Sequence, residues 1–326
     1  MGSDLLGVLS DIGDWMDWDS GGDTQGNDGS DSAADPEEVL HNAAEVYLST
    51  LDAYVSAAPF WGSDGSNSTE SSGDDRAHND TSLVSVVPEF DKAAAATCPA
   101  LLGDGSTSSS TEASTFSLVC SSSSSSDSDD SNGDDDSSSN SSSLVTATVV
   151  STNTATVVVP APSPAESDSN KNASSNTTET EVYTVSVTTW STANSSAAVA
   201  QLADSSSSSS ASLMSDIYGV HVTDSDGASA SAEVDGSTEE SAGYTVEIQL
   251  SASATDTTTA AESLRARVSC RYFDEGEGVW SERGVVLRGL RVESAPTVST
   301  SAPLEVSAVC VSSHLTLFTV EDDSAV

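Results

Sequence analysis

The chain has 326 residues, of which 52 are acidic and nine are basic, so its formal net charge is −43 at pH 7. This charge repels nucleic acids and anionic membrane surfaces, and neither is expected as a partner. Aromatic residues make up 5% of the chain and long stretches are rich in serine. The composition therefore excludes one large core and favours a modest core joined by long, disordered Ser/Asp-rich linkers.

The first predicted element is a disordered leader over residues 1–35, which is polar apart from a patch around Trp15 and Trp18. No basic residue precedes Arg76, so the leader lacks the charged start of a signal peptide. No apolar run in the chain is long enough to span a bilayer. One interpretation is that the chain is a fragment of a larger protein.

A single amphipathic helix is predicted over residues 36–58. Asp35-Pro36-Glu37-Glu38 provides a capping carboxylate, a proline in the first turn and acids near the positive helix end. Apolar residues then recur at helical spacing: Leu40, Ala43, Tyr47, Leu51, Tyr54 and Ala58. Residues 59–143 follow as a mostly disordered linker, in which the Ser/Asp tract over 121–143 cannot form a core.

The composition changes after Ser143, and residues 144–326 are predicted to be rich in β-structure. Several runs are rich in Val and Thr with partial alternation, which is typical of strands. These runs are Leu144–Val150, Thr156–Val159, Glu181–Trp190, Ile217–Thr223 and Tyr244–Ser251. Six of the nine basic residues lie between Arg265 and Arg291. The fold class is therefore predicted to be mainly β, with an all-β sandwich in the C-terminal half.

Three groups of residues follow one another near the C-terminus. They are Cys270-x-Tyr272-Phe273-Asp274, Gly278-x-Trp280-Ser281-x-x-Gly284 and Cys310-x-x-x-His314-Leu315-Thr316-x-Phe318-x-Val320. In order, spacing and residue type, this region (270–320) resembles the GPS motif, the proteolysis site that ends GAIN domains in adhesion receptors and polycystin-like proteins. The resemblance implies that the β-rich region over 144–326 is a GAIN-like β-sandwich.

The resemblance also implies that the chain cleaves its own backbone between Leu315 and Thr316. The Thr316 hydroxyl would attack the carbonyl carbon of Leu315, and a neighbouring base must accept its proton because threonine is a weak nucleophile. His314 is the implied base, since imidazole titrates near neutral pH. An N-to-O acyl shift would give an ester that water hydrolyses. This single-turnover reaction has no external substrate and no cofactor, so the chain is not expected to be an enzyme.

The other motif residues are expected to support this site. Tyr272, Phe273, Trp280, Gly284 and Phe318 are structural residues of the motif, and the large aromatic ones are expected in the core. The resemblance implies a disulfide between Cys270 and Cys310, the family's first and third cysteines. Where the family has its other cysteine pair, this chain has Val285 and Ser312. The pairing of Cys98 and Cys120 stays open.

Two alternative metal sites were considered and neither is predicted. Cys310-x-x-x-His314 has a spacing that could suit a metal, but a second close ligand pair is missing. The acidic run over 128–133 approaches a calcium loop, but Ser128 and Ser139 occupy two key ligand positions. No metal and no cofactor are therefore expected.

The resemblance places the chain on the extracellular face of a membrane, or among secreted proteins. Six sequons would make it a glycoprotein: Asn67, Asn79, Asn140, Asn172, Asn176 and Asn194. The expected partners are the cleaved C-terminal strand, held non-covalently, and a downstream transmembrane region beyond Val326. Two alternatives remain, a cell-surface or adhesion segment that does not cleave and an acidic, disordered chain without a defined site.

Overall fold

The computed structural model describes ten segments of the chain: residues 36–57, 86–103, 106–123, 147–159, 183–193, 196–205, 212–224, 244–251, 263–293 and 305–322. The expected leader over residues 1–35 lies outside these segments. The labelled helices are α2 (Pro36–Ala57), α3 (Val86–Ala95), α4 (Cys98–Leu102) and α5 (Ala197–Asp204). None of the described helices is long and apolar enough to cross a membrane.

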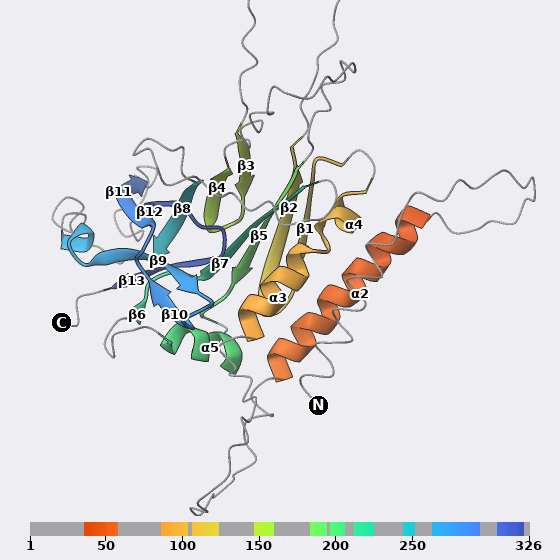
Figure 1. The fold of residues 1–326 in the computed structure, drawn as a ribbon, viewed down its shortest axis with the longest axis horizontal. Helices are drawn as coiled ribbons and strands as arrows, with labels where there is room; N and C mark the ends of the chain where they lie inside the picture. Colours follow the sequence, from red (N-terminus) through yellow and green to blue (C-terminus); the bar gives the residue numbers. More distant parts are fainter. Residues whose placement is uncertain are drawn as a thin grey trace, which may run out of the picture.

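Most of the described residues form two antiparallel sheets, so the chain is mainly β as predicted (Figure 1). The first sheet has the order β1-β2-β5-β7-β13-β9-β10, and β6 pairs with β13 off this path. Its strands are β1 (Ser108–Glu112), β2 (Phe116–Ser122), β5 (Tyr183–Trp190), β6 (Ser212–Leu213), β7 (Ile217–Asp224), β9 (Val268–Asp274), β10 (Val279–Ser281) and β13 (Leu317–Asp322).

The second sheet has the order β11-β12-β8-β4-β3. Its strands are β3 (Thr148–Ser151), β4 (Ala155–Val159), β8 (Tyr244–Ser251), β11 (Val285–Glu293) and β12 (Glu305–Ser312). The runs of Val and Thr named above correspond to β3, β4, β5, β7 and β8, because alternating β-branched residues pack well on a half-buried sheet face.

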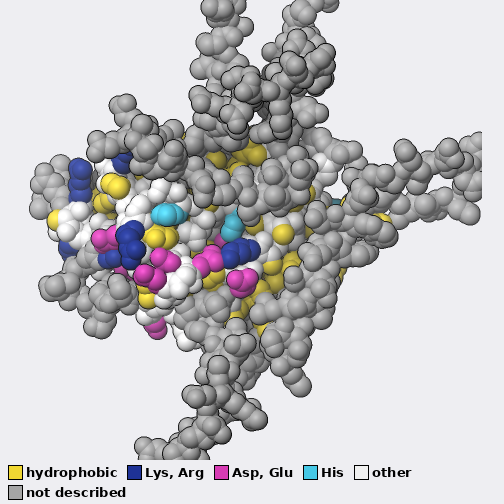
Figure 2. All heavy atoms as spheres, viewed as in Figure 1, with side chains coloured by type: hydrophobic (Ala, Val, Ile, Leu, Met, Phe, Trp, Pro, Cys, Tyr) yellow, Lys and Arg dark blue, Asp and Glu magenta, His cyan; other side chains and the backbone are white. Residues whose placement is uncertain are grey.

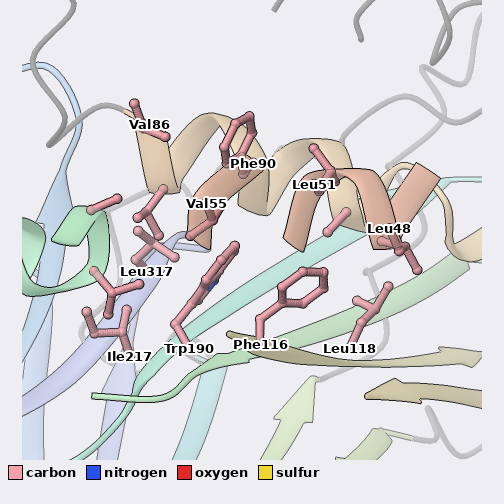
Figure 3. Packing of buried hydrophobic residues seen from close by; sticks show 14 of the residues in the cluster. Leu48, Leu51, Val55, Val86, Phe90, Phe116, Leu118, Trp190, Ile217 and Leu317 are labelled. Carbon is pink, nitrogen blue, oxygen red and sulfur yellow. The ribbon is translucent and has the colours of Figure 1, made fainter. Parts of the chain in front are cut away.

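Two hydrophobic clusters divide the molecule into three layers. One cluster lies between the two sheets and takes residues from strands of both, for example Val157, Val246, Val220 and Phe318. The other lies between the first sheet and the helices, as Figure 3 shows for Phe90, Trp190 and Leu317. The first sheet is therefore covered on both faces, and every residue of β5 is buried. The helices lie on one side of this sheet and the second sheet on the other (Figure 1).

The expected linker over residues 59–143 is corrected by the structure. Part of it forms α3, α4, β1 and β2, which pack against α2 and pair with β5. In α3, Val86, Val87, Phe90 and Ala94 fall on one buried face, and β2 buries Phe116, Leu118 and Cys120 by simple alternation. The helix expected over 36–58 is α2, but it is one of several helices rather than a single one.

Two disulfides connect the layers. Cys98 and Cys120 join α4 to β2, and Cys270 and Cys310 join β9 of the first sheet to β12 of the second. All four cysteine side chains are buried. The described residues are thus tied together from the helix layer to the second sheet.

Candidate functional site

The residues His314-Leu315-Thr316 lie in the short connection from β12 to β13, where the chain passes from one sheet to the other. The turn before them is fixed by Ser312, which is 1% exposed. Its hydroxyl accepts a hydrogen bond from the His314 amide (2.9 Å) and donates one to the His314 carbonyl oxygen (3.1 Å). The backbone around His314 is therefore held by a side chain at the end of β12.

The His314 ring is exposed and lies flat on the ring of Tyr272 in β9. The two ring centroids are 4.5 Å apart and the planes differ by 17°. The ring also lies over Gly284, where an added Cβ would come within 2.6 Å of His314 Nε2. Gly284 has a φ of +75°, which favours glycine for a second reason. Tyr272, Gly284 and His314 are thus brought together from three separate parts of the motif.

Ser313 anchors the same connection to the turn before β11. Its amide and its hydroxyl both donate to the carbonyl oxygen of Gly284, at 2.9 and 3.2 Å. This places the backbone of the connection directly against Gly284. The backbone that carries the exposed histidine is therefore held by two sets of hydrogen bonds, one from Ser312 and one between Ser313 and Gly284.

Thr316 is held between the two strands that flank β13. Its hydroxyl donates to the carbonyl oxygen of Phe273 in β9 (3.4 Å), and its carbonyl oxygen accepts from the Val220 amide in β7 (3.1 Å). The side chain is 9% exposed. Within the described residues, no hydrogen bond joins the Thr316 hydroxyl to the His314 ring.

Leu315 is half-buried between these two residues and packs against the cluster between the sheets. The peptide bond between Leu315 and Thr316 therefore lies at the boundary between an exposed turn and a buried strand. From Leu317 to Glu321 every residue of β13 is buried.

The remaining aromatic residues of the motif belong to the core. Phe273 and Trp280 pack edge to face with ring centroids 5.4 Å apart, and Trp280 Nε1 donates to the carbonyl oxygen of Leu202 in α5 (2.9 Å). Phe318 is 1% exposed and lies between the sheets. These side chains stabilise the strands that carry the site, and they do not face the Leu315–Thr316 bond as reactive groups.

The cysteine positions are informative as a set. Cys270 and Cys310 are joined, which is the pair that the resemblance implies. Val285 and Ser312, where the resemblance would place the other two cysteines, are direct partners in the β11–β12 ladder. Both are buried. Ser312 also holds the His314 backbone.

Cys310 is in a disulfide, so its sulfur is not a thiolate ligand for a metal beside His314. Among the residues that the structure describes, no group of three or more His, Cys, Asp or Glu side chains could hold a metal ion.

Sequence reasoning missed the charged residues on the helix side of the site. Asp91 of α3 is buried and bonded to His221 of β7, and its neighbour Lys92 is bonded to Glu275 in the β9–β10 turn. Figure 2 shows acidic, basic and histidine side chains in a band that crosses this face from β9 and β10 towards α3. The partners are more than a hundred residues apart in sequence, so no local pattern could have revealed them.

Two disulfides are typical of proteins that fold in an oxidising compartment, and they favour an extracellular or secreted protein. Comparison with protein-family models and with curated proteins finds no match to this chain.

Proposed function

We propose that the C-terminal region cleaves its own backbone between Leu315 and Thr316, as GPS motifs do. One observation carries this proposal: Tyr272, Gly284 and His314, which are distant in sequence, converge on the turn that precedes Thr316. A purely structural role would not require an exposed histidine on this turn. The same motif, spread over residues 270–320, also supplies the strand that holds the Thr316 hydroxyl.

The proposed reaction has two steps. In the first, the Thr316 oxygen bonds to the Leu315 carbonyl carbon while His314 accepts the hydroxyl proton. The C–N bond of the peptide then breaks and the nitrogen takes up that proton, which leaves a Leu315–Thr316 ester and a free amino group. In the second step water hydrolyses the ester to a Leu315 carboxylate and a free Thr316 hydroxyl. No redox partner or cofactor is required.

The starting arrangement must change before the first step. The Thr316 hydroxyl donates to Phe273, and the His314 ring is stacked on Tyr272. A rotation of the Thr316 side chain away from β9 would turn its oxygen towards the Leu315 carbonyl carbon. Binding to Phe273 thus favours a resting state, and cleavage is expected to be slow.

This same observation favours a second candidate function, a cell-surface or adhesion segment that does not cleave. In that case the Thr316 hydroxyl is a structural hydrogen-bond donor between two strands, and His314 is a surface residue packed on Tyr272. The two candidates predict the same fold and differ only in whether the Leu315–Thr316 bond breaks.

After cleavage the C-terminal segment would stay in place without a covalent link. Strand β13 pairs with β9 over five residues and also with β7 and β6. An ion pair adds to this pairing, because Arg271 Nε lies 3.1 Å from a carboxylate oxygen of the buried Glu321. The cleaved strand would therefore remain bound to the rest of the domain as a non-covalent partner. The proposed place is the extracellular face of a membrane, with a transmembrane region downstream.

The test is the intact mass of the denatured chain after expression through a secretory pathway. Cleavage would separate residues 316–326, and hydroxylamine should accelerate it by attacking the ester. Thr316→Val keeps the side-chain shape and removes the nucleophile, whereas Thr316→Ser keeps a hydroxyl. We expect no cleavage in the first variant and cleavage in the second. A wild-type chain that stays whole under these conditions would contradict the proposal and support the non-cleaving segment.

A further inference from the structure

Two consecutive residues of α3 reach the two strands that lie on either side of β13. In the first sheet β13 lies between β7 and β9. Asp91 is bonded to His221 of β7, and Lys92 is bonded to Glu275, which directly follows β9. The helix is thus attached to both neighbours of the final strand.

In the attachment to β7, His221 is partly exposed, Asp91 is buried, and both Asp91 oxygens accept hydrogen bonds. His221 Nε2 donates to Asp91 Oδ2 (2.6 Å), and Asp91 Oδ1 accepts from Trp190 Nε1 (3.1 Å) and from the Thr188 hydroxyl. Asp91 is 1% exposed. Its carboxylate lies so close to Gly219 that a Cβ there would overlap it. A buried carboxylate with these partners is costly to separate from them.

The attachment to β9 is exposed and reaches over the start of β13. Lys92 Nζ lies 2.5 Å from Glu275 Oε2 and 3.6 Å from Glu89 Oε1. Partial burial lowers the pKa of Lys92, but the two carboxylates outweigh it and hold that pKa above its usual value. Asp274 fixes the turn that presents Glu275, because its carboxylate accepts the amides of Gly276 and Glu277 at 3.0 and 3.1 Å.

Both attachments fall at the level where β13 begins. Gly219, which touches the Asp91 carboxylate, is the register partner of Leu317, and the next residue, Val220, holds the Thr316 carbonyl oxygen. Leu317 itself points into the cluster beneath α3 (Figure 3). Any shift of α3 would therefore be transmitted to the first residues of β13 from both sides.

We propose that α3 acts as a clamp that keeps the start of β13 between β7 and β9, with Asp91 and His221 on one side and Lys92 and Glu275 on the other. These four residues position Thr316 through the flanking strands and do not touch the reacting atoms. The effect of the clamp on cleavage rests on the proposed function, whereas its role in holding β13 in the sheet does not. The clamp also acts in a chain that never cleaves.

Hydrogen exchange in the Thr316→Val chain, read by mass spectrometry, separates these two effects. His221→Leu should speed exchange of the Val220 amide and of the amides of β13 by about tenfold or more, since leucine cannot donate to the buried Asp91 side chain. Lys92→Met should speed them by about two- to fivefold, as for an exposed ion pair. Arg283→Met is the matched control, because it removes an ion pair to Glu277 in the same region that does not reach α3.

Exchange in β8 and β12 should stay unchanged in every variant. If exchange in β8 and β12 rises as much as in β13, the chain is destabilised in general and the clamp proposal is wrong. The proposal is also wrong if exchange in β13 does not change. If His221→Leu does not fold, the comparison of Lys92→Met with Arg283→Met still decides the question.

Cleavage is then measured in the chain with Thr316 intact. If the wild type cleaves, Lys92→Met should alter the rate and Arg283→Met should not. If the wild type does not cleave, the proposed function fails while the exchange result still decides the clamp.

Discussion

Gly284 and the His314 ring occupy adjoining space, and this makes the glycine the most constrained residue of the site. Its φ of +75° disfavours any side chain, and a Cβ would lie 2.6 Å from both His314 Nε2 and Ser313 Oγ. The His314 ring is exposed and can swing away, so its share of the clash would be relieved by loss of the stack on Tyr272. The position of the histidine therefore depends on a residue thirty positions earlier in the sequence.

Gly284→Ala should displace the His314 ring from Tyr272. Gly278→Ala is a matched control, because Gly278 has a similar φ of +69° and open space around it. Both variants should lose about 1–3 kcal/mol of unfolding free energy from backbone strain. Only Gly284→Ala should remove the ring-current shift of the His314 ring protons, measured by NMR. An unchanged shift in that variant would show that the stacking of His314 on Tyr272 does not depend on Gly284.

The motif allowed several site residues to be named from sequence, but not their contacts. His314, Tyr272 and Gly284 were named from a resemblance in order, spacing and residue type, whereas the stacking of one ring on the other and the proximity of Gly284 needed the folded chain. The Asp91–His221 pair had no sequence signal at all. Its members sit in an amphipathic helix and a strand, where a single acid or histidine is ordinarily a surface residue.

Among the secondary-structure elements, α2 depends on a single carboxylate for its attachment to the β1–β2 turn. Asp52 accepts hydrogen bonds from the amides of Ser114 and Thr115 at 3.1 and 2.8 Å, and from both of their hydroxyls. Burial raises the pKa of Asp52, but these hydrogen bonds outweigh it and lower that pKa below its usual value. The ionised form is therefore the one that the folded state favours.

Asp52→Asn should lower the unfolding free energy by about 1 kcal/mol near pH 6, because amide groups lose a charged acceptor. The pKa is lower in the folded chain, so this contribution is complete above the unfolded value of about 3.9 and is lost as the pH falls through the folded value. The difference between the variant and the wild type should therefore shrink in acid. Urea unfolding at pH 6 and at pH 3 measures it.

Glu45→Gln is the control for this effect, since Glu45 lies on the same helix and its carboxylate lies 3.5 Å from the exposed His41 ring. We expect a smaller change at pH 6. An Asp52→Asn difference that stays constant down to pH 3 would contradict a charge-linked attachment of α2.

Strands were predicted from sequence in the Val- and Thr-rich runs after Ser143, whereas β1 and β2 were assigned to a linker, although β2 also alternates. Residues 217–223 and 244–251 carry regular Val and Ile positions and form β7 and β8. By contrast β1 reads Ser-Ser-Ser-Thr-Glu, contains no apolar residue and, among the described strands, pairs with β2 alone at the edge of the first sheet. Its backbone hydrogen bonds, not its side chains, place it in the sheet, so composition assigned it to a linker.

At the scale of the whole molecule, the three layers are joined by two disulfides in series. One bridge connects the helix layer to the first sheet, and the other connects the first sheet to the second. Cross-links restrict the unfolded chain and so add to the stability of these layers. The second bridge also joins β9, which carries Tyr272, to β12, which carries Ser312. It therefore fixes both supports of His314.

Replacing Cys270 and Cys310 together by alanine should lower the unfolding free energy by about 4 kcal/mol, since the bridge closes a loop of 40 residues. Replacing Cys98 and Cys120 together should cost slightly less, about 3.4 kcal/mol, for a loop of 22 residues. Urea unfolding of the oxidised chains measures both. The two variants should differ more in the mobility of the site than in stability, because only loss of the Cys270–Cys310 bridge frees β9 from β12. Faster exchange of the His314 amide in the Cys270/Cys310 variant alone is expected, and equal exchange in both would show that this bridge does not hold the site.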